Sequence, residues 1–284
     1  METPYANEPV WERPEPQPRA APVPLNRAKI AAAAVRLADD QGLDGLSVRK
    51  LAGALGVGPM RLYDYVANRA EILDLMVDAV YAEIAGADAD ADADDGADRR
   101  ATVPSVKQVD AVHGADRRPT VPSVKQVDAV HGETAQVGDG ADWRATILAI
   151  KHRTRAAALA HEWFADLLGG RPHLGPNALA VGEATAAALS RAPGVRDLDD
   201  LQRALGVLNA FMIGALRAEI TERRTARTTG TELAAWQSSL GPYLTRMLDT
   251  GRYPTVARLV VDGAHLDPDE TFARNLATVL QGIT

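Results

Sequence analysis

Residues 47–66 carry the pattern of two short helices joined by a tight glycine turn. Ser47 offers a hydroxyl cap to the first helix, whose spacing predicts one apolar face made by Val48, Leu51, Ala52 and Leu55. Gly56 ends that helix in a backbone conformation that glycine adopts cheaply, and Pro59 suits the first turn of a second helix. This order of helix, glycine turn and helix is typical of units that place a helix in the major groove of DNA.

In the second helix, the spacing turns Leu62 and Val66 inward, because they lie four residues apart. The outer faces then belong to six residues, namely Pro59, Met60, Arg61, Tyr63, Asp64 and Tyr65. The amino end of this helix is expected to enter the groove.

The flanking segments also predict helices with identifiable ends. Asn26 caps a helix that Gly42 ends, and Asn68 caps a further helix in which Glu71 completes a capping box. We therefore expect a helix-turn-helix DNA-binding domain over residues 25–67. A connecting helix is expected over residues 68–85.

The net charge of −7 argues against a DNA-binding protein only when it is taken over the whole chain. Between Leu25 and Val66 there are six basic residues against four acidic ones. The local balance of charge, rather than the total, decides whether DNA is attracted.

Two segments depart from the helical pattern. Residues 1–24 contain seven prolines and are expected to form a disordered arm, because they have too little apolar surface to offset the entropy of ordering. Residues 86–141 form a low-complexity insert, in which residues 97–114 recur as residues 115–132 with one change. We interpret this tandem duplication as a flexible surface elaboration.

After residue 142 the helical period returns and predicts about six more helices and no strand hairpin. The helix that begins at Leu198 has apolar residues on two faces, and the last helix has one stripe, made by Phe272, Leu276, Val279, Leu280 and Ile283. Two such helices from each subunit would form an intermolecular four-helix bundle. We therefore expect an all-α homodimer.

Several classes of protein are excluded or disfavoured. The chain has no cysteine, which excludes disulfides and cysteine metal sites. No leader opens it and no apolar run approaches the roughly 20 residues of a bilayer span, so we expect a cytoplasmic protein without a membrane partner. Serines lack a His and acid partner at recognisable spacing, and His152 and His161 lie too far apart on one helix to share a metal. We expect neither an enzyme nor a bound metal or cofactor.

Residues 47–76 read SVRKLAGALGVGPMRLYDYVANRAEILDLM. The Leu-Gly-Val turn, the Leu-Tyr pair after it and the aromatic-Val-x-Asn-Arg link into a capped helix occur together. With this block, and less specifically with residues 143–180, the chain resembles the tetracycline-repressor (TetR) family and its subgroup with a TetR-type regulatory domain. The resemblance implies an all-α fold, with an N-terminal three-helix DNA-binding domain and an effector-binding and dimerisation domain over residues 142–284.

The resemblance also implies the DNA contacts, by position in the motif. Bases would be contacted by Arg49, Pro59, Met60, Arg61 and Asp64, and phosphates would be held by Ser47, Lys50, Tyr63 and Arg69. Arginine grips guanine at two atoms, whereas hydroxyls and cations position the backbone, so these residue types suit the two roles.

Three positions depart from the family's pattern. Gly58 stands where many members have a polar cap, Asp64 puts an anion on the groove-facing helix, and Tyr65 stands where His is common. Asp64 either accepts a hydrogen bond from a cytosine amino group or pairs with Arg61 one turn back. The DNA sequence bound by a relative therefore does not transfer to this chain.

The same resemblance places an effector cavity at Trp163, Phe164, Leu174, Asn177, Asn209, Phe211 and Met212, although ordinary core packing explains most of these residues. It implies a repressor that binds a palindromic double-stranded DNA operator as a homodimer and is released by a small-molecule effector. The alternative is a ligand-binding or scaffold protein on the same fold without operator binding. The acidic total, Asp64 and the insert favour that alternative.

Overall fold

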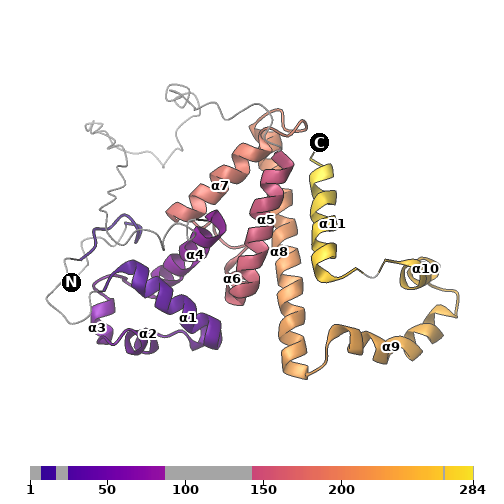
Figure 1. Cartoon of the computed structure of the whole chain (residues 1–284), viewed down its shortest axis with the longest axis horizontal. Coiled ribbons are helices and arrows are strands. Elements are labelled where there is room, and N and C mark those ends of the chain that lie inside the picture. Colours follow the sequence, from indigo (N-terminus) through magenta and orange to yellow (C-terminus); the bar gives the residue numbers. More distant parts are fainter. Residues whose placement is uncertain (1–7, 17–24, 87–142, 265, 284) are drawn as a thin grey trace, which may run out of the picture. The chain divides into compact units, whose positions relative to one another are not determined.

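The computed structural model describes residues 8–16, 25–86, 143–264 and 266–283, and these ranges contain helices and no strand (Figure 1). The first four helices are α1 (Arg27–Gly45), α2 (Val48–Ala54), α3 (Pro59–Leu62) and α4 (Arg69–Ala85). The others are α5 (Trp143–Ala160), α6 (Glu162–Leu167), α7 (Pro176–Leu189), α8 (Leu198–Thr229), α9 (Leu233–Leu248), α10 (Pro254–Asp262) and α11 (Pro268–Gln281). Except for Gly86, the duplicated insert lies outside the described residues.

Local sequence explains where the first helices begin. The side chains of Asn26, Ser47 and Asn68 accept hydrogen bonds from the amides of Lys29, Lys50 and Glu71 at 2.8, 3.2 and 3.1 Å. These three predicted caps are confirmed. The expected capping box is wrong in one detail, because the Glu71 carboxylate accepts from the amide of Ala67, at 2.7 Å, and not from that of Asn68.

Gly42 kinks α1 instead of ending it. Its φ of 70° lies in the left-handed region, but helical structure continues beyond the kink to Gly45. The prediction that the helix stops at Gly42 is therefore only partly right, since one further turn precedes Leu46.

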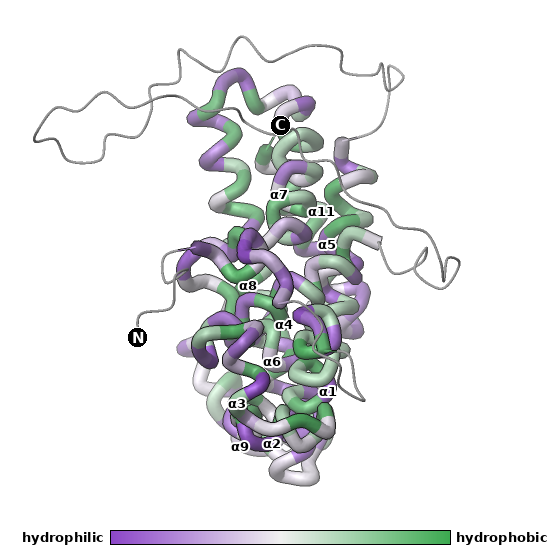
Figure 2. The backbone as a smooth tube through the Cα atoms, turned by 90° about the vertical axis from the view of Figure 1, so that its left-hand side faces the viewer, coloured by the Kyte–Doolittle hydropathy of each residue, from purple (hydrophilic) through white to green (hydrophobic). Residues whose placement is uncertain are grey.

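The core forms where the amphipathic helices turn their apolar faces toward one another. α4 packs against α1 and also against α5 and α7, so it connects the helix-turn-helix to the rest of the bundle. Figure 2 shows polar and apolar residues alternating along the helices, as this packing requires. Ile30, Leu62, Ile72, Ile147 and Leu208 are among the fully buried side chains.

The proline-rich arm is not wholly disordered, contrary to the sequence prediction. Within residues 8–16, Val10 is buried and Trp11 is half-buried against the core. Arg13 forms an ion pair with Glu71 at the start of α4, and Arg27 of α1 donates to the carbonyl of Arg13 at 2.6 Å. Two apolar side chains and one buried ion pair hold this short stretch. Residues 1–7 and 17–24 lie outside the described residues.

The carboxyl-terminal helices divide into a packed pair and an exposed pair. α8 and α11 pack together and bury Phe272, Leu276 and Leu280, so the stripe that the sequence offered to a partner is used within the subunit. α9 and α10 follow α8 and extend away from the packed helices in Figure 1, and they contain no buried residue.

α8 departs from the expectation that no segment of the chain is long and apolar enough to span a membrane. Within the described ranges it is the one helix long and apolar enough to cross a bilayer by length and composition. The core helices of helical bundles meet the same criterion, and α8 buries Leu208, Met212 and Leu216 against its neighbours.

Candidate nucleic-acid interface and effector cavity

The predicted helix-turn-helix is confirmed in outline. α2 and α3 contact each other, and Leu51 and Leu62 are fully buried between them and α1. Gly56 has a φ of 66°, which places the turn in the region that favours glycine. α3 is shorter than expected, since it ends at Leu62 and the chain continues as a turn.

This early end of α3 overturns one prediction. Tyr65, which was expected on an outer face, is only 4% exposed. The helical spacing that places a side chain outside does not apply beyond Leu62. The carbonyl of Tyr65 instead accepts a hydrogen bond from Arg27 Nε at 3.2 Å.

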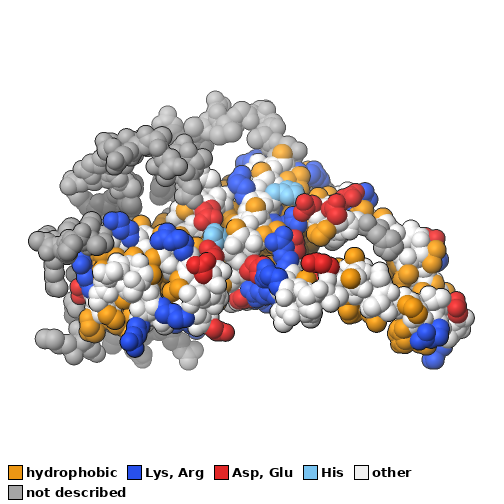
Figure 3. Space-filling view, turned by 60° about the horizontal axis from the view of Figure 1, so that its bottom comes forward, with side chains coloured by type: hydrophobic (Ala, Val, Ile, Leu, Met, Phe, Trp, Pro, Cys, Tyr) orange, Lys and Arg blue, Asp and Glu red, His pale blue; other side chains and the backbone are white. Residues whose placement is uncertain are grey.

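The residues expected to contact DNA lie on α2, α3 and the segments next to them. Met60 and Tyr63 are 76% and 46% exposed, which is far more than packing requires. Ser47, Arg49, Lys50, Pro59, Asp64 and Arg69 are also exposed, and Arg61 is half-buried. Figure 3 shows Lys and Arg side chains and exposed hydrophobic ones gathered over the first helices, at the left of the view.

Two of the cations are held in place by α1. Lys50 donates to the side chain of Gln41 at 2.7 Å, and Arg69 donates to the carbonyl of Leu43 at 2.7 Å. Both contacts orient a cation near the end of α1 and leave it exposed. Such orientation suits a contact to phosphate, which needs a positioned charge.

A polar cluster joins the DNA-binding helices to α6. Asp39 of α1 accepts from His161 Nδ1 at 2.9 Å and from Trp163 Nε1 at 2.7 Å. His161 Nε2 faces Glu83 of α4 at 3.1 Å. Burial opposes the charged imidazole, but Asp39 and Glu83 outweigh it and raise the pKa of His161. His161 therefore bridges α1 and α4.

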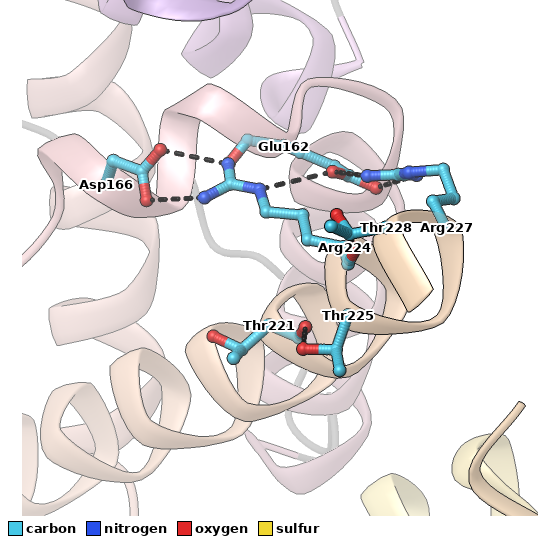
Figure 4. Close-up of polar contacts among 7 residues, drawn as sticks. All are labelled: Glu162, Asp166, Thr221, Arg224, Thr225, Arg227 and Thr228. Carbon is cyan, nitrogen blue, oxygen red and sulfur yellow. Dashed lines mark hydrogen bonds and ion pairs between the residues drawn. The ribbon is translucent and has the colours of Figure 1, made fainter. Parts of the chain in front are cut away.

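A second cluster fastens α6 to α8 (Figure 4). Arg224 donates to both oxygens of Asp166, at 3.1 and 2.9 Å, and Arg227 donates to Glu162 at 2.8 Å. The hydrogen bond from Arg227 is the main reason that the pKa of Glu162 is lowered. These charges border a cleft of about 820 Å³ between α1, α6 and α8, in which each of these four side chains already has a partner.

A separate cavity of about 380 Å³ lies between α4, α5, α7, α8 and the segment that follows α6. Its apolar wall includes Val181, Leu205, Met212, Ile213 and Leu216, and its polar lining includes Tyr81, Lys151, Arg171, His173 and Asn209. An apolar cavity with a few convergent polar groups is the usual form of a small-molecule site, and its volume is within the normal range.

The structure distributes the predicted effector residues over different places. Asn209 and Met212 line the 380 Å³ cavity, whereas Trp163 borders the charged cleft. Phe211 faces another cleft, between α8 and α11.

The three other predicted effector residues have local roles. Phe164 is fully buried, with its ring 5.5 Å from that of Tyr81. Leu174 is 59% exposed. Asn177 donates to the carboxylate of Asp78, which also accepts from the amide of Ala178.

Sequence reasoning missed Lys151, although the signal was present. α5 buries Ile147, Ile150 and Lys151, so the lysine occupies the apolar stripe of an amphipathic helix. A cation on such a stripe needs a partner or a ligand.

In the described residues, a helix-turn-helix is joined to a helical body that contains a cavity, which is the architecture of helical DNA-binding transcriptional regulators. Comparison with known proteins narrows this class. Residues 137–284 match the family described as "Tetracyclin repressor-like, C-terminal domain".

Relatives and solved structures agree with this match. The HTH-type transcriptional repressor DrrR1 of Streptomyces coeruleorubidus is 30% identical over 94% of this chain and 80% of its own length. An HTH-type transcriptional regulator of Saccharopolyspora erythraea is 33% identical over 74% of this chain and 67% of its own. ActR from Streptomyces coelicolor, solved without ligand, has a TM-score of 0.63 at 23% identity and covers 93% of this chain and 96% of its own; it has also been solved in complex with actinorhodin.

The chain therefore belongs to the TetR family of transcriptional regulators. This family consists of regulators and not of enzymes.

Proposed function

We propose that this protein is a cytoplasmic, ligand-responsive repressor that binds a palindromic operator as a homodimer and is released by a small-molecule effector. One observation carries the proposal. The exposed face of α2 and α3 combines Arg49, Lys50 and Tyr63 with the apolar Met60, although nothing in the fold requires these side chains to be outside. That mixture suits phosphate contacts around a base-contacting helix.

Homodimerisation is supported by apolar surface that a single subunit leaves exposed. Trp236, Leu240 and Tyr243 of α9 are 54%, 38% and 55% exposed, and Leu259 of α10 is 65% exposed. Apolar surface of this kind marks an interaction site. Two copies would place their recognition helices about 34–36 Å apart, the spacing of successive major grooves on one side of DNA.

The route from effector to operator would pass through α4. Tyr81 of α4 lines the 380 Å³ cavity, and the amino end of the same helix carries Arg69, which donates to the carbonyl of Leu43 in α1. An effector that binds better to the arrangement off DNA would shift the equilibrium by its differential affinity.

Residues 25–67 would thus be the DNA-binding domain, residues 68–85 the connecting helix and residues 142–284 the effector-binding and dimerisation domain. Base contacts are assigned to Arg49, Pro59, Met60, Arg61 and Asp64, and phosphate contacts to Ser47, Lys50, Tyr63 and Arg69. Asn209 and Met212 are the predicted effector residues that remain assigned to the cavity.

The operator test uses the full chain and the intergenic DNA upstream of its own gene, with binding followed by fluorescence anisotropy over a series of salt concentrations. Arg49→Ala and Arg61→Ala are each expected to weaken binding by about 1–3 kcal/mol, and Tyr63→Phe is expected to weaken it less. Arg274→Ala changes an exposed arginine of α11 and is the matched control. Binding that is independent of salt, and equal in the wild type and the three variants, would show that this surface does not hold DNA.

A further inference from the structure

Lys151 is a buried cation that has no counter-ion among the described residues. The residue is 6% exposed and lines the 380 Å³ cavity. In the described part of the chain, no hydrogen bond or ion pair reaches its ammonium group, and burial lowers its pKa from 10.5 to about 8. A buried charge that lacks a partner destabilises the fold, so a lysine at this position points to a role beyond packing.

Arg155 lies one turn further along α5 and is a buried cation whose charge is compensated by carboxylates. Its guanidinium donates to both oxygens of Glu219, at 2.8 and 2.7 Å, and to Asp269 at 2.7 Å. The hydrogen bond with Glu219 is the main reason that the pKa of Arg155 is raised. α5 therefore buries two cations, and carboxylates compensate only the one that points away from the cavity.

The lining of the cavity contains cations and neutral donors but, in the described residues, no carboxylate. The titratable groups that share it with Lys151 are Tyr81 from α4 and Arg171 and His173 from the segment after α6; α7 and α8 contribute none. Burial, and then Asp78, raises the pKa of Tyr81, so its phenol stays protonated and can donate a hydrogen bond. The cavity thus presents donors and positive charge within an apolar wall.

We propose that Lys151 anchors an anionic oxygen of the effector, so that this cavity accepts an apolar organic anion such as an aromatic carboxylate or an acidic phenol. The proposal rests on the proposed function, because it names the chemical class of the effector. A charge-assisted hydrogen bond supplies the partner that the ammonium group lacks, and the apolar wall buries the remainder of the ligand.

The test compares aromatic carboxylates of increasing size with their neutral carboxamides, namely benzoate, naphthalene-2-carboxylate and anthracene-2-carboxylate, by isothermal titration calorimetry on the full chain. The wild type should bind at least one acid about tenfold or more tightly than its amide, since one hydrogen bond to a charged group is worth a decade in affinity. Lys151→Met should abolish this preference and leave binding of the amide intact. Lys29→Met, on the exposed side of α1, is the matched control.

Proton uptake on binding is a second measurement. A purely structural role for Lys151 would not produce it. At pH 8.5 the free lysine is largely neutral, and an anion that binds beside it restores the charged form, so binding should take up a fraction of a proton. Titration in two buffers of different ionisation enthalpy measures this uptake. It should vanish in Lys151→Met, and the affinity of the wild type for the acid should fall as the pH rises above 8.

The outcomes separate the two proposals. An absence of preference for any acid over its amide, or a preference that survives in Lys151→Met and is lost in Arg171→Gln, would overturn the role of Lys151. Operator binding is measured independently, so its persistence in that case would leave the repressor proposal standing. If operator binding were absent but the preference for the acid over its amide were intact, the role of Lys151 would stand and the repressor proposal would fall.

Discussion

The charged residues of this protein form ion pairs that differ in how deeply their side chains are buried. Arg13 and Glu71 form an ion pair with side chains only 9% and 18% exposed, whereas Arg274 and Glu270 form an i,i+4 pair that is 62% and 45% exposed. Water screens the second pair more strongly than the first. The Arg13 Nε atom is also buried without a partner among the described residues, so the guanidinium is not fully hydrogen-bonded.

This contrast predicts unequal effects of one substitution at two sites. Arg13→Met should lower the free energy of unfolding by about 1–3 kcal/mol, because Glu71 loses a partly buried partner. Arg274→Met should cost about 0.5 kcal/mol or less. Urea denaturation at one fixed protein concentration measures both. Equal losses would mean that the Arg13–Glu71 pair contributes no more to stability than an exposed ion pair.

At the level of elements, α7 depends on α4 for its beginning. Gly175 precedes α7 and offers no side-chain cap, and Asp78 of α4 supplies one, by accepting from the amides of Asn177 and Ala178 at 3.0 Å each. A Cβ atom on Gly175 would lie 2.2 Å from the Asp78 carboxylate, so only glycine permits this approach. The helix that lines the cavity is thereby tied to the helix that leads to the recognition unit.

Asp78→Ala should therefore cost more than the loss of an ordinary cap. It leaves buried donors without an acceptor, for which we expect a loss of about 2–3 kcal/mol in the free energy of unfolding. The matched change Asp267→Ala removes the local cap of α11 and should cost about 1 kcal/mol. Chemical denaturation of both variants is the measurement, and a smaller loss for Asp78→Ala than for Asp267→Ala would contradict a shared role for α4 and α7.

At the scale of the whole molecule, the proposed dimer depends on surface that no single subunit covers. α9 and α10 carry apolar side chains at helical spacing, yet none of their residues is buried. If a second copy covers them, charges placed there should separate the subunits.

The double substitution Trp236→Glu and Leu259→Glu is expected to raise the dimer dissociation constant by about tenfold or more, because truncation of central apolar anchors dominates interface energies. Sedimentation velocity over a dilution series measures this constant. Gln237→Glu with Thr255→Glu adds the same charge at exposed polar positions of the same helices and should leave it unchanged. A double Trp236 and Leu259 variant that dimerises like the wild type would assign the interface to other helices.

Sequence alone predicted the features that depend on neighbours along the chain. The caps at Asn26, Ser47 and Asn68, the glycine turn at Gly56 and the inward positions of Leu62 and Val66 follow from local hydrogen bonding and helical period, and they are found as predicted. The errors at Gly42 and Tyr65 arose where a helix was assumed to stop or to continue by one turn, because boundaries depend on weak local preferences.

Only the tertiary structure decided which distant groups meet. It placed Asp78 at the start of α7, Arg13 on Glu71 and Asp39 beside His161, in each case joining residues separated by at least 58 positions. It also gave Arg155 two carboxylate partners and left Lys151 with a cavity instead. The helical period shows that both cations lie on the buried side of α5, but the partner of a buried charge comes from other helices, so only their packing determines which cation is left to bind a ligand.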